Sequence, residues 1–166
     1  MIADHAAVIT AALTRRLVAV TVNGVSMEPA YQDRDQVLAI RGTRLKVGRV
    51  VVVESPFGTS GWRQRALATK AAPSLVSQRR WMIKRVVALP GDPVPRRSVP
   101  ALADVAEDWV PNGMAVLLGD NQSASFDSRA FGYFPLERIL GVVRVAVRAQ
   151  NGSPSSREPS GPVGAV

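Results

Sequence analysis

Residues 81–92 of the chain read Trp-Met-Ile-Lys-Arg-Val-Val-Ala-Leu-Pro-Gly-Asp. The apolar and β-branched side chains at the start of this stretch favour a strand, and the Pro-Gly-Asp sequence ends it with a turn. Alternation along a strand places Lys84 on the same face as Met82 and Val86. The stretch therefore predicts a strand that holds a lysine among apolar neighbours.

Further segments share this short, apolar character and are separated by Gly and Pro turn signals. They are 17–22, 36–40, 49–54, 114–118 and 139–147. Such a pattern predicts a mostly β fold, built as a small β-barrel or as folded sheets. We expect a short helix over 2–16 in front of it and an irregular, exposed insertion over 55–78.

The length of 166 residues predicts one folded domain. We assign residues 1–19 to an N-terminal segment, 20–149 to the folded domain and 150–166 to a disordered tail, because the end is rich in Ser, Pro and Gly. The apolar run over 6–20 contains Arg15 and Arg16 and falls short of the about 20 residues that a spanning helix needs. We expect a chain that is soluble or at most associated with a membrane surface.

The formal net charge is +8, and arginine supplies 18 of the 21 basic residues. A basic surface favours polyanions, anionic lipid surfaces or acidic partners. An arginine-rich, solvated surface without a specific partner explains the same balance.

The composition excludes several catalytic classes. The chain has no cysteine, and His5 is its single histidine, so thiol catalysis and zinc clusters built from histidines are excluded. The sequence around Ser26 lacks the second glycine of a hydrolase elbow, because Glu28 stands there. No lysine follows a serine by three residues, which excludes the pattern of penicillin-binding proteins.

Ser26 lies in the turn-like run Gly24-Val-Ser-Met-Glu-Pro29. Gly24 permits a close backbone approach, and a serine on such a turn presents its hydroxyl and its own N–H outward. A serine in this setting is also common as a structural turn residue.

A serine hydroxyl needs a neighbouring base, and a lysine amine serves only when it is neutral. Burial among apolar residues favours the neutral form, and Lys84 has the most apolar surroundings of the three lysines. The alternative is that Lys84 is a solvated strand residue.

A third polar segment covers 119–129 and includes Ser125, Asp127 and Arg129. It fits an Asx-rich loop, or a loop that positions the lysine through a carboxylate–guanidinium pair.

In combination, these segments resemble the sequence boxes of type I signal peptidases, the Ser/Lys endopeptidases of the S26 family. The resemblance runs from about residue 20 to 147 in the family's order, through 24–29, 48–52, 84–92 and 119–135. It implies that 20–149 is a peptidase catalytic domain that works without a metal or organic cofactor. It also implies that the partner is a precursor protein or leader peptide, cut after small residues.

Carried over to this chain, the resemblance makes Ser26 the nucleophile and Lys84 the general base. Ser125 would orient the lysine amine, and Asp127 and Arg129 would hold the surrounding loop. In some members the residue two before the nucleophile adds a hydroxyl to the oxyanion hole, but here it is Gly24. Met27 would line part of the substrate site.

Members of the family normally carry a membrane-spanning helix before the serine. The resemblance therefore implies that the protein lies at the extracytoplasmic face of the cell membrane. Only 25 residues precede Ser26 here. A late start site, docking through the basic surface, or a soluble and cytoplasmic member each explains this. Ala30 also replaces the usual Thr, which we expect to affect packing more than chemistry.

Soluble relatives that trim nickel superoxide dismutase precursors make a dedicated maturation protease an alternative. Self-cleaving repressors share the dyad, but this chain has no room for their DNA-binding domain. A non-catalytic basic β-module that binds polyanions is a further alternative. Aromatic residues make up only 5% of the chain, and no aromatic-basic interleaving resembles a stacking platform for nucleic acid.

Overall fold

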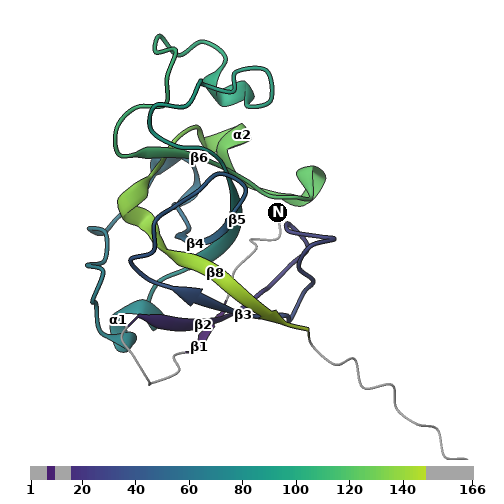
Figure 1. Cartoon of the computed structure of the whole chain (residues 1–166), viewed down its shortest axis with the longest axis vertical. Coiled ribbons are helices and arrows are strands. Elements are labelled where there is room, and N and C mark those ends of the chain that lie inside the picture. Colours follow the sequence, from purple (N-terminus) through teal and green to yellow (C-terminus); the bar gives the residue numbers. More distant parts are fainter. Residues whose placement is uncertain (1–6, 10–15, 149–166) are drawn as a thin grey trace, which may run out of the picture.

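The computed structural model of the chain describes residues 7–9 and 16–148. Over these ranges the chain forms a curled antiparallel sheet with strand order β1-β2-β3-β8-β4-β5-β6-β7 (Figure 1). The strands are β1 (Ala7–Ile9), β2 (Leu17–Thr21), β3 (Gln36–Ile40), β4 (Val50–Glu54), β5 (Trp81–Ala88), β6 (Met114–Leu118), β7 (Phe134–Pro135) and β8 (Ile139–Val147).

This architecture confirms the predicted β-rich class and the six predicted strands. The expected N-terminal helix is wrong at residues 7–9, which form β1 instead. In β1, Ala7 lies opposite Thr21 and Ile9 opposite Ala19, so pairing with β2 overrides the helix preference of an alanine-rich segment. Residues 2–6 and 10–15 of the predicted helix lie outside the described ranges. The predicted tail over 150–166 also lies outside them.

The longest strand, β8, connects the two halves of the sheet. Residues 142–147 of β8 pair with β3, and residues 139–142 pair with β4. Gly141 lies where β8 passes the end of β3: a Cβ atom at this position would come within 2.7 Å of the Ile40 carbonyl oxygen. Glycine therefore permits the close backbone approach that joins the halves.

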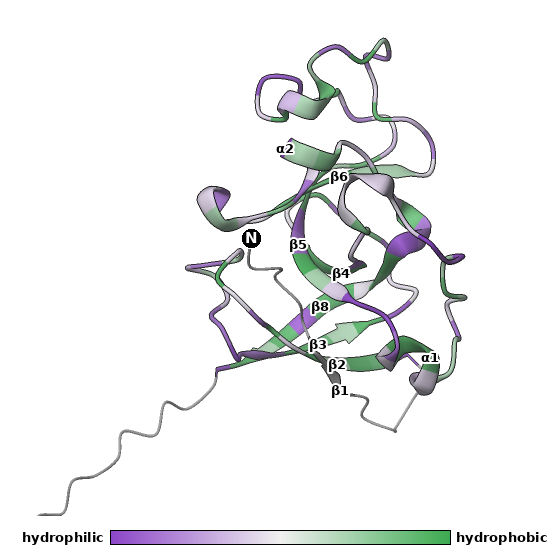
Figure 2. Cartoon of the chain, turned by 180° about the vertical axis from the view of Figure 1, so that it is seen from behind, coloured by the Kyte–Doolittle hydropathy of each residue, from purple (hydrophilic) through white to green (hydrophobic). Residues whose placement is uncertain are grey.

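Strands β4 and β5 are buried on both faces. Val52 and Ile83 belong to one core cluster, and Val51, Met82 and Val86 belong to another. This explains why residues 50–53 are all valine rather than alternating, and Figure 2 shows hydrophobic residues along β2 and β5. The face of β5 that carries Lys84 is thus an interior face, as the alternation predicts.

The segment over 55–78 is largely irregular, as predicted, with a short 3₁₀ turn η1 (Gly58–Ser60) and a helix α1 (Pro73–Ser77). The prediction that it is exposed is wrong in part. Val76 is completely buried in the first core cluster, and Trp62 packs edge-on against Phe131 and Phe134. Apolar anchors therefore hold this segment against the sheet.

A proline-rich excursion separates β5 from β6 and lies at the top of Figure 1. Its only regular element within the described residues is a 3₁₀ turn, η2 (Pro100–Leu102), and Val99 and Leu102 are buried in a third core cluster. After β6 come η3 (Gln122–Ala124), α2 (Ser128–Phe131) and, after β7, η4 (Leu136–Arg138). Among the residues described, no helix has both the length and the apolar character needed to cross a bilayer.

Candidate active site

The fold brings together the serine and the lysine that the sequence singles out. Lys84 Nζ lies 2.9 Å from Ser26 Oγ, although 58 residues separate them in the chain. The lysine is completely buried and Ser26 is 2% exposed, so the contact is shielded from bulk water. Lys84 is therefore an interior residue, and the alternative of a solvated strand lysine is excluded.

Local backbone bonds hold the turn that carries Ser26. Gly24 has a φ of 92°, a conformation that favours glycine, and its N–H donates to Asp33 Oδ1 across 2.7 Å. The Glu28 N–H donates to the Val25 carbonyl across 3.1 Å, which closes the turn around the serine. The peptide bond between Glu28 and Pro29 is cis.

Met27 follows the nucleophile candidate and is 1% exposed, within the first core cluster. It anchors the turn by its apolar side chain, because a buried methionine of this kind makes many dispersion contacts. Its expected part in a substrate pocket stays a prediction.

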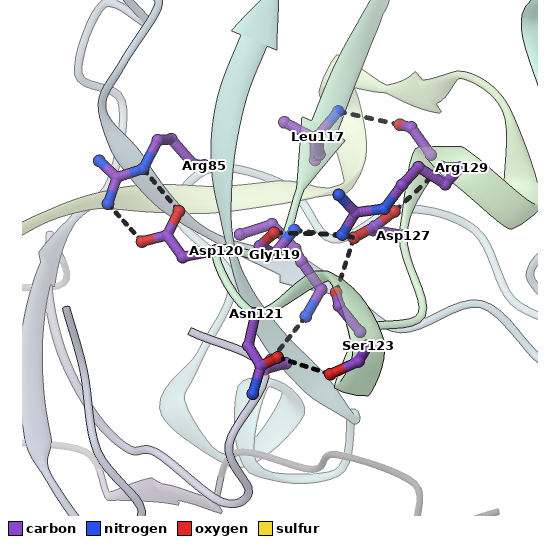
Figure 3. A network of polar contacts seen from close by, with 12 residues as sticks. Arg85, Leu117, Gly119, Asp120, Asn121, Ser123, Asp127 and Arg129 are labelled. Carbon is purple, nitrogen blue, oxygen red and sulfur yellow. Dashed lines mark hydrogen bonds and ion pairs between the residues drawn. The ribbon is translucent and has the colours of Figure 1, made fainter. Parts of the chain in front are cut away.

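The predicted polar loop forms one connected network centred on a buried carboxylate. Asp127 Oδ2 accepts from Ser125 Oγ at 2.7 Å, from the Gly119 N–H at 2.8 Å and from Arg129 Nη2 at 2.6 Å. Asp127 also caps α2, because its Oδ1 accepts from the Arg129 N–H at 3.0 Å. Figure 3 shows this network, together with the bond from the Leu117 N–H to Ser128 Oγ.

Ser125 gives its hydroxyl hydrogen to Asp127, so its oxygen lone pairs point elsewhere and can accept a hydrogen bond. A lysine amine is a donor of the right kind. The expected bond from Lys84 to Ser125 stays a prediction. Asp127 and Arg129 form a carboxylate–guanidinium pair at 2.6 Å. Their expected role in holding the loop around the lysine stays a prediction.

Gly119 opens the polar segment over 119–129, but the sequence did not predict a role for this glycine itself. A Cβ atom there would lie 2.1 Å from Ser125 Oγ and 2.7 Å from the Ser26 carbonyl oxygen. The lack of a side chain therefore lets β6 end against both the serine turn and the polar loop. A glycine directly after a buried strand was the signal that could have identified it.

Asn121 is a second residue of this segment whose contacts the sequence did not predict. Its backbone N–H donates to the Ser26 carbonyl at 2.9 Å, and its side-chain Nδ2 donates to the Val25 carbonyl at 3.1 Å. Its Oδ1 accepts from Ser123 Oγ at 3.0 Å (Figure 3). The Gly-Asp-Asn order at a strand end indicates a turn but does not reveal which carbonyls the amide will meet.

Asp120 lies beside this loop and faces Arg85 of β5. The guanidinium donates through Nε at 2.8 Å and through Nη2 at 2.6 Å to the two carboxylate oxygens. This bidentate bond raises the pKa of Arg85 above its usual value, and burial raises the pKa of the neighbouring Tyr31. The pair ties the end of β6 to β5 next to Lys84.

No group of three or more potential metal-ligating side chains occurs among the described residues.

A cavity of about 450 Å³ lies away from the serine and is lined in part by Arg41, Glu54 and Arg138. Glu54 is paired there with Arg138 at 2.9 Å and with Arg79 at 2.6 Å. Burial lowers the pKa of Arg41, which donates to the carbonyls of Ala68 and Ala71.

Comparison with known proteins supports the resemblance. The family described as signal peptidase, peptidase S26, matches residues 2–99 and 96–148. The chain is 30% identical over 149 residues to mitochondrial inner membrane protease subunit 1 of Xenopus tropicalis, covering 86% of this chain and 76% of that protein. It is also 30% identical over 126 residues to the Mus musculus protein of the same name, covering 74% of this chain and 64% of that protein.

Proposed function

Because the chain belongs to the signal peptidase family, peptidase S26, we propose that it is a serine endopeptidase with a Ser26–Lys84 dyad. Its substrates are precursor proteins, from which it removes N-terminal signal or leader peptides by cutting after small residues. The observation that carries this proposal is the buried 2.9 Å contact between Lys84 Nζ and Ser26 Oγ.

The dyad accounts for the first half of the reaction. A neutral Lys84 amine accepts the Ser26 hydroxyl proton while Oγ attacks the carbonyl carbon of the scissile peptide bond. The resulting ammonium gives its proton to the departing nitrogen, and the C–N bond breaks. The mature product leaves with a new N-terminus, and the leader remains as an ester on Ser26.

The second half uses the same base. Lys84 removes a proton from a water molecule, which attacks the ester carbonyl, and the proton then returns to Ser26 Oγ. Burial of the amine favours the neutral form that both halves require. In this proposal, the hydrogen bonds that Asp127 accepts from Ser125, Gly119 and Arg129 hold the loop beside the reacting groups in place.

The negative oxygen that forms during each attack needs hydrogen-bond donors, and the Ser26 N–H is the donor that we propose. Gly24 contributes no hydroxyl, and its own N–H is engaged by Asp33. The orientation of the Ser26 N–H is therefore decisive for the rate.

The names of the two relatives concern proteases of the mitochondrial inner membrane. By that likeness we infer that this chain acts at a membrane surface, at which precursors emerge. A dedicated maturation protease would use the same dyad on a single precursor, and only the range of substrates cleaved would distinguish it.

The decisive experiment incubates the purified chain with a precursor that carries an Ala-x-Ala cleavage sequence. We expect cleavage by the wild type and by the controls Ser74→Ala and Lys70→Ala, which change exposed residues. Ser26→Ala and Lys84→Ala should lose turnover while they keep the fold. Equal cleavage by all five proteins would exclude the dyad, whereas salt-sensitive binding of polyanions without cleavage would favour the basic β-module.

A further inference from the structure

The peptide unit between Val25 and Ser26 carries the N–H that the proposed reaction needs. A peptide unit is planar and trans, so its carbonyl and its N–H point in opposite directions. Whatever holds the Val25 carbonyl therefore also aims the Ser26 N–H. In this structure that carbonyl accepts from the Glu28 N–H and from Asn121 Nδ2, both at 3.1 Å.

Asn121 also holds the peptide unit on the other side of the serine. Its backbone N–H donates to the Ser26 carbonyl at 2.9 Å. One residue from the loop after β6 thus restrains both peptide planes that meet at the Ser26 α-carbon. Rotation of Ser26 about its own backbone bonds would break one of these two hydrogen bonds.

Ser123 determines which end of the Asn121 side chain faces the turn. An asparagine amide has an acceptor end and a donor end that are similar in shape. Ser123 Oγ donates to Oδ1 at 3.0 Å, which keeps the oxygen away from the turn and leaves Nδ2 directed at the Val25 carbonyl. With the amide reversed, two acceptor oxygens would face each other.

We propose that Asn121 is a positioning residue that aims the Ser26 N–H at the oxyanion, and that Ser123 locks the orientation of its amide. The proposal rests on the proposed acyl transfer at Ser26. It assigns to these residues an effect on the transition state, where the oxygen becomes negative, and little effect on binding of the uncleaved peptide.

The test compares Asn121→Ala, Asn121→Asp and Ser123→Ala with Gln122→Ala, an exposed neighbour in η3. We expect kcat to fall about tenfold in Asn121→Ala and about a hundredfold in Asn121→Asp, where an anionic acceptor faces a carbonyl. Ser123→Ala should lose about threefold because the amide can then reverse. KM should stay near the wild-type value in each variant, and Gln122→Ala should match the wild type.

A second readout separates positioning from a general loss of structure. A peptide aldehyde ending in alanine forms a hemiacetal with Ser26 and so mimics the oxyanion, whereas the matching peptide amide binds without reacting. We expect the affinity for the aldehyde to fall by the same factor as kcat, and the affinity for the amide to stay constant. The mild Ser123→Ala variant keeps the test valid where an Asn121 variant unfolds.

The outcomes distinguish this proposal from the function on which it rests. If Ser26→Ala is inactive but the Asn121 and Ser123 variants match the wild type, the positioning role is wrong and the dyad stands. A rise in KM with unchanged kcat also overturns the positioning role. If the wild type does not cleave, or Ser26→Ala cleaves equally well, both proposals fall.

Discussion

A Cβ atom at Gly119 would lie 2.1 Å from Ser125 Oγ, so the end of β6 and the Ser125 side chain adjoin with no room for a methyl group. The same atom would lie 2.7 Å from the Ser26 carbonyl oxygen. The position of the nucleophile candidate thus depends on a residue that has no side chain.

Gly119→Ala should displace Ser125, Ser26 or both. Because misplacement of reacting groups by about 1 Å can cost a hundredfold in rate, we expect a loss of this order in turnover. Overpacking should also lower the free energy of unfolding by about 1–3 kcal/mol. Peptide cleavage and urea denaturation measure the two effects. Adding Ser125→Gly should restore part of the stability, and an additive double variant would contradict the predicted clash.

Lys84→Met should separate catalysis from stability. Methionine is similar in length and removes the buried amine, so the free energy of unfolding should fall by no more than about 1.5 kcal/mol. Turnover should fall by about a thousandfold or more because Ser26 loses its proposed base. Denaturant titration beside a cleavage assay tests this, and a variant that unfolds at room temperature would show that the amine is required for the fold.

The cleavage rate should rise with pH as the neutral fraction of Lys84 increases, because an ammonium group cannot accept the Ser26 proton. The measurement is kcat/KM for a peptide substrate across neutral and alkaline pH, within the range where the protein stays folded. A rate that is constant or falls through this range would argue against a lysine base. The residual activity of Lys84→Met serves as the control and should lack the rise.

Tyr31 makes stability depend on alkaline pH. Its pKa in the folded state is raised above the ordinary value of 10.0, chiefly by burial. The unfolded chain therefore loses this proton first, so the stability contribution is complete below pH 10.0 and is lost as the pH rises through the folded value. We expect Tyr31→Phe to weaken the decline in unfolding free energy above pH 10.0, as followed by denaturant titrations at several pH values. An unchanged decline would contradict the prediction.

Glu54→Gln should affect stability more than catalysis. The carboxylate is paired with Arg79 and Arg138, all in largely buried positions, and breaking buried pairs of this kind costs about 3–5 kcal/mol. The comparison is Asp108→Asn, which removes an exposed pair with Arg96 and should cost less than about 1 kcal/mol. Equal losses in urea denaturation would contradict the difference, and kcat per folded molecule should be unchanged in both.

Much of the fold was predictable because the strands are short apolar runs between turn signals. The valines at 50–53 and the alternation around Lys84 indicate buried strands on local grounds alone. The strand at 7–9 was not predictable in this way, because Ala7 and its neighbours favour a helix until β2 offers a partner. Val76 and Trp62 were missed for a similar reason, since their burial depends on what the insertion meets in space.

For the candidate site, the sequence by itself determined the available chemistry: a serine on a glycine turn, three lysines, no cysteine, and a polar loop with a carboxylate and an arginine. Only the tertiary structure decided that Lys84 reaches Ser26, that Gly119 lies against Ser125, and that Asn121 holds the Val25 carbonyl. The physical reason is that residue types and local periodicity are properties of short segments, whereas these contacts form when the sheet curls and brings distant strand ends and turns together.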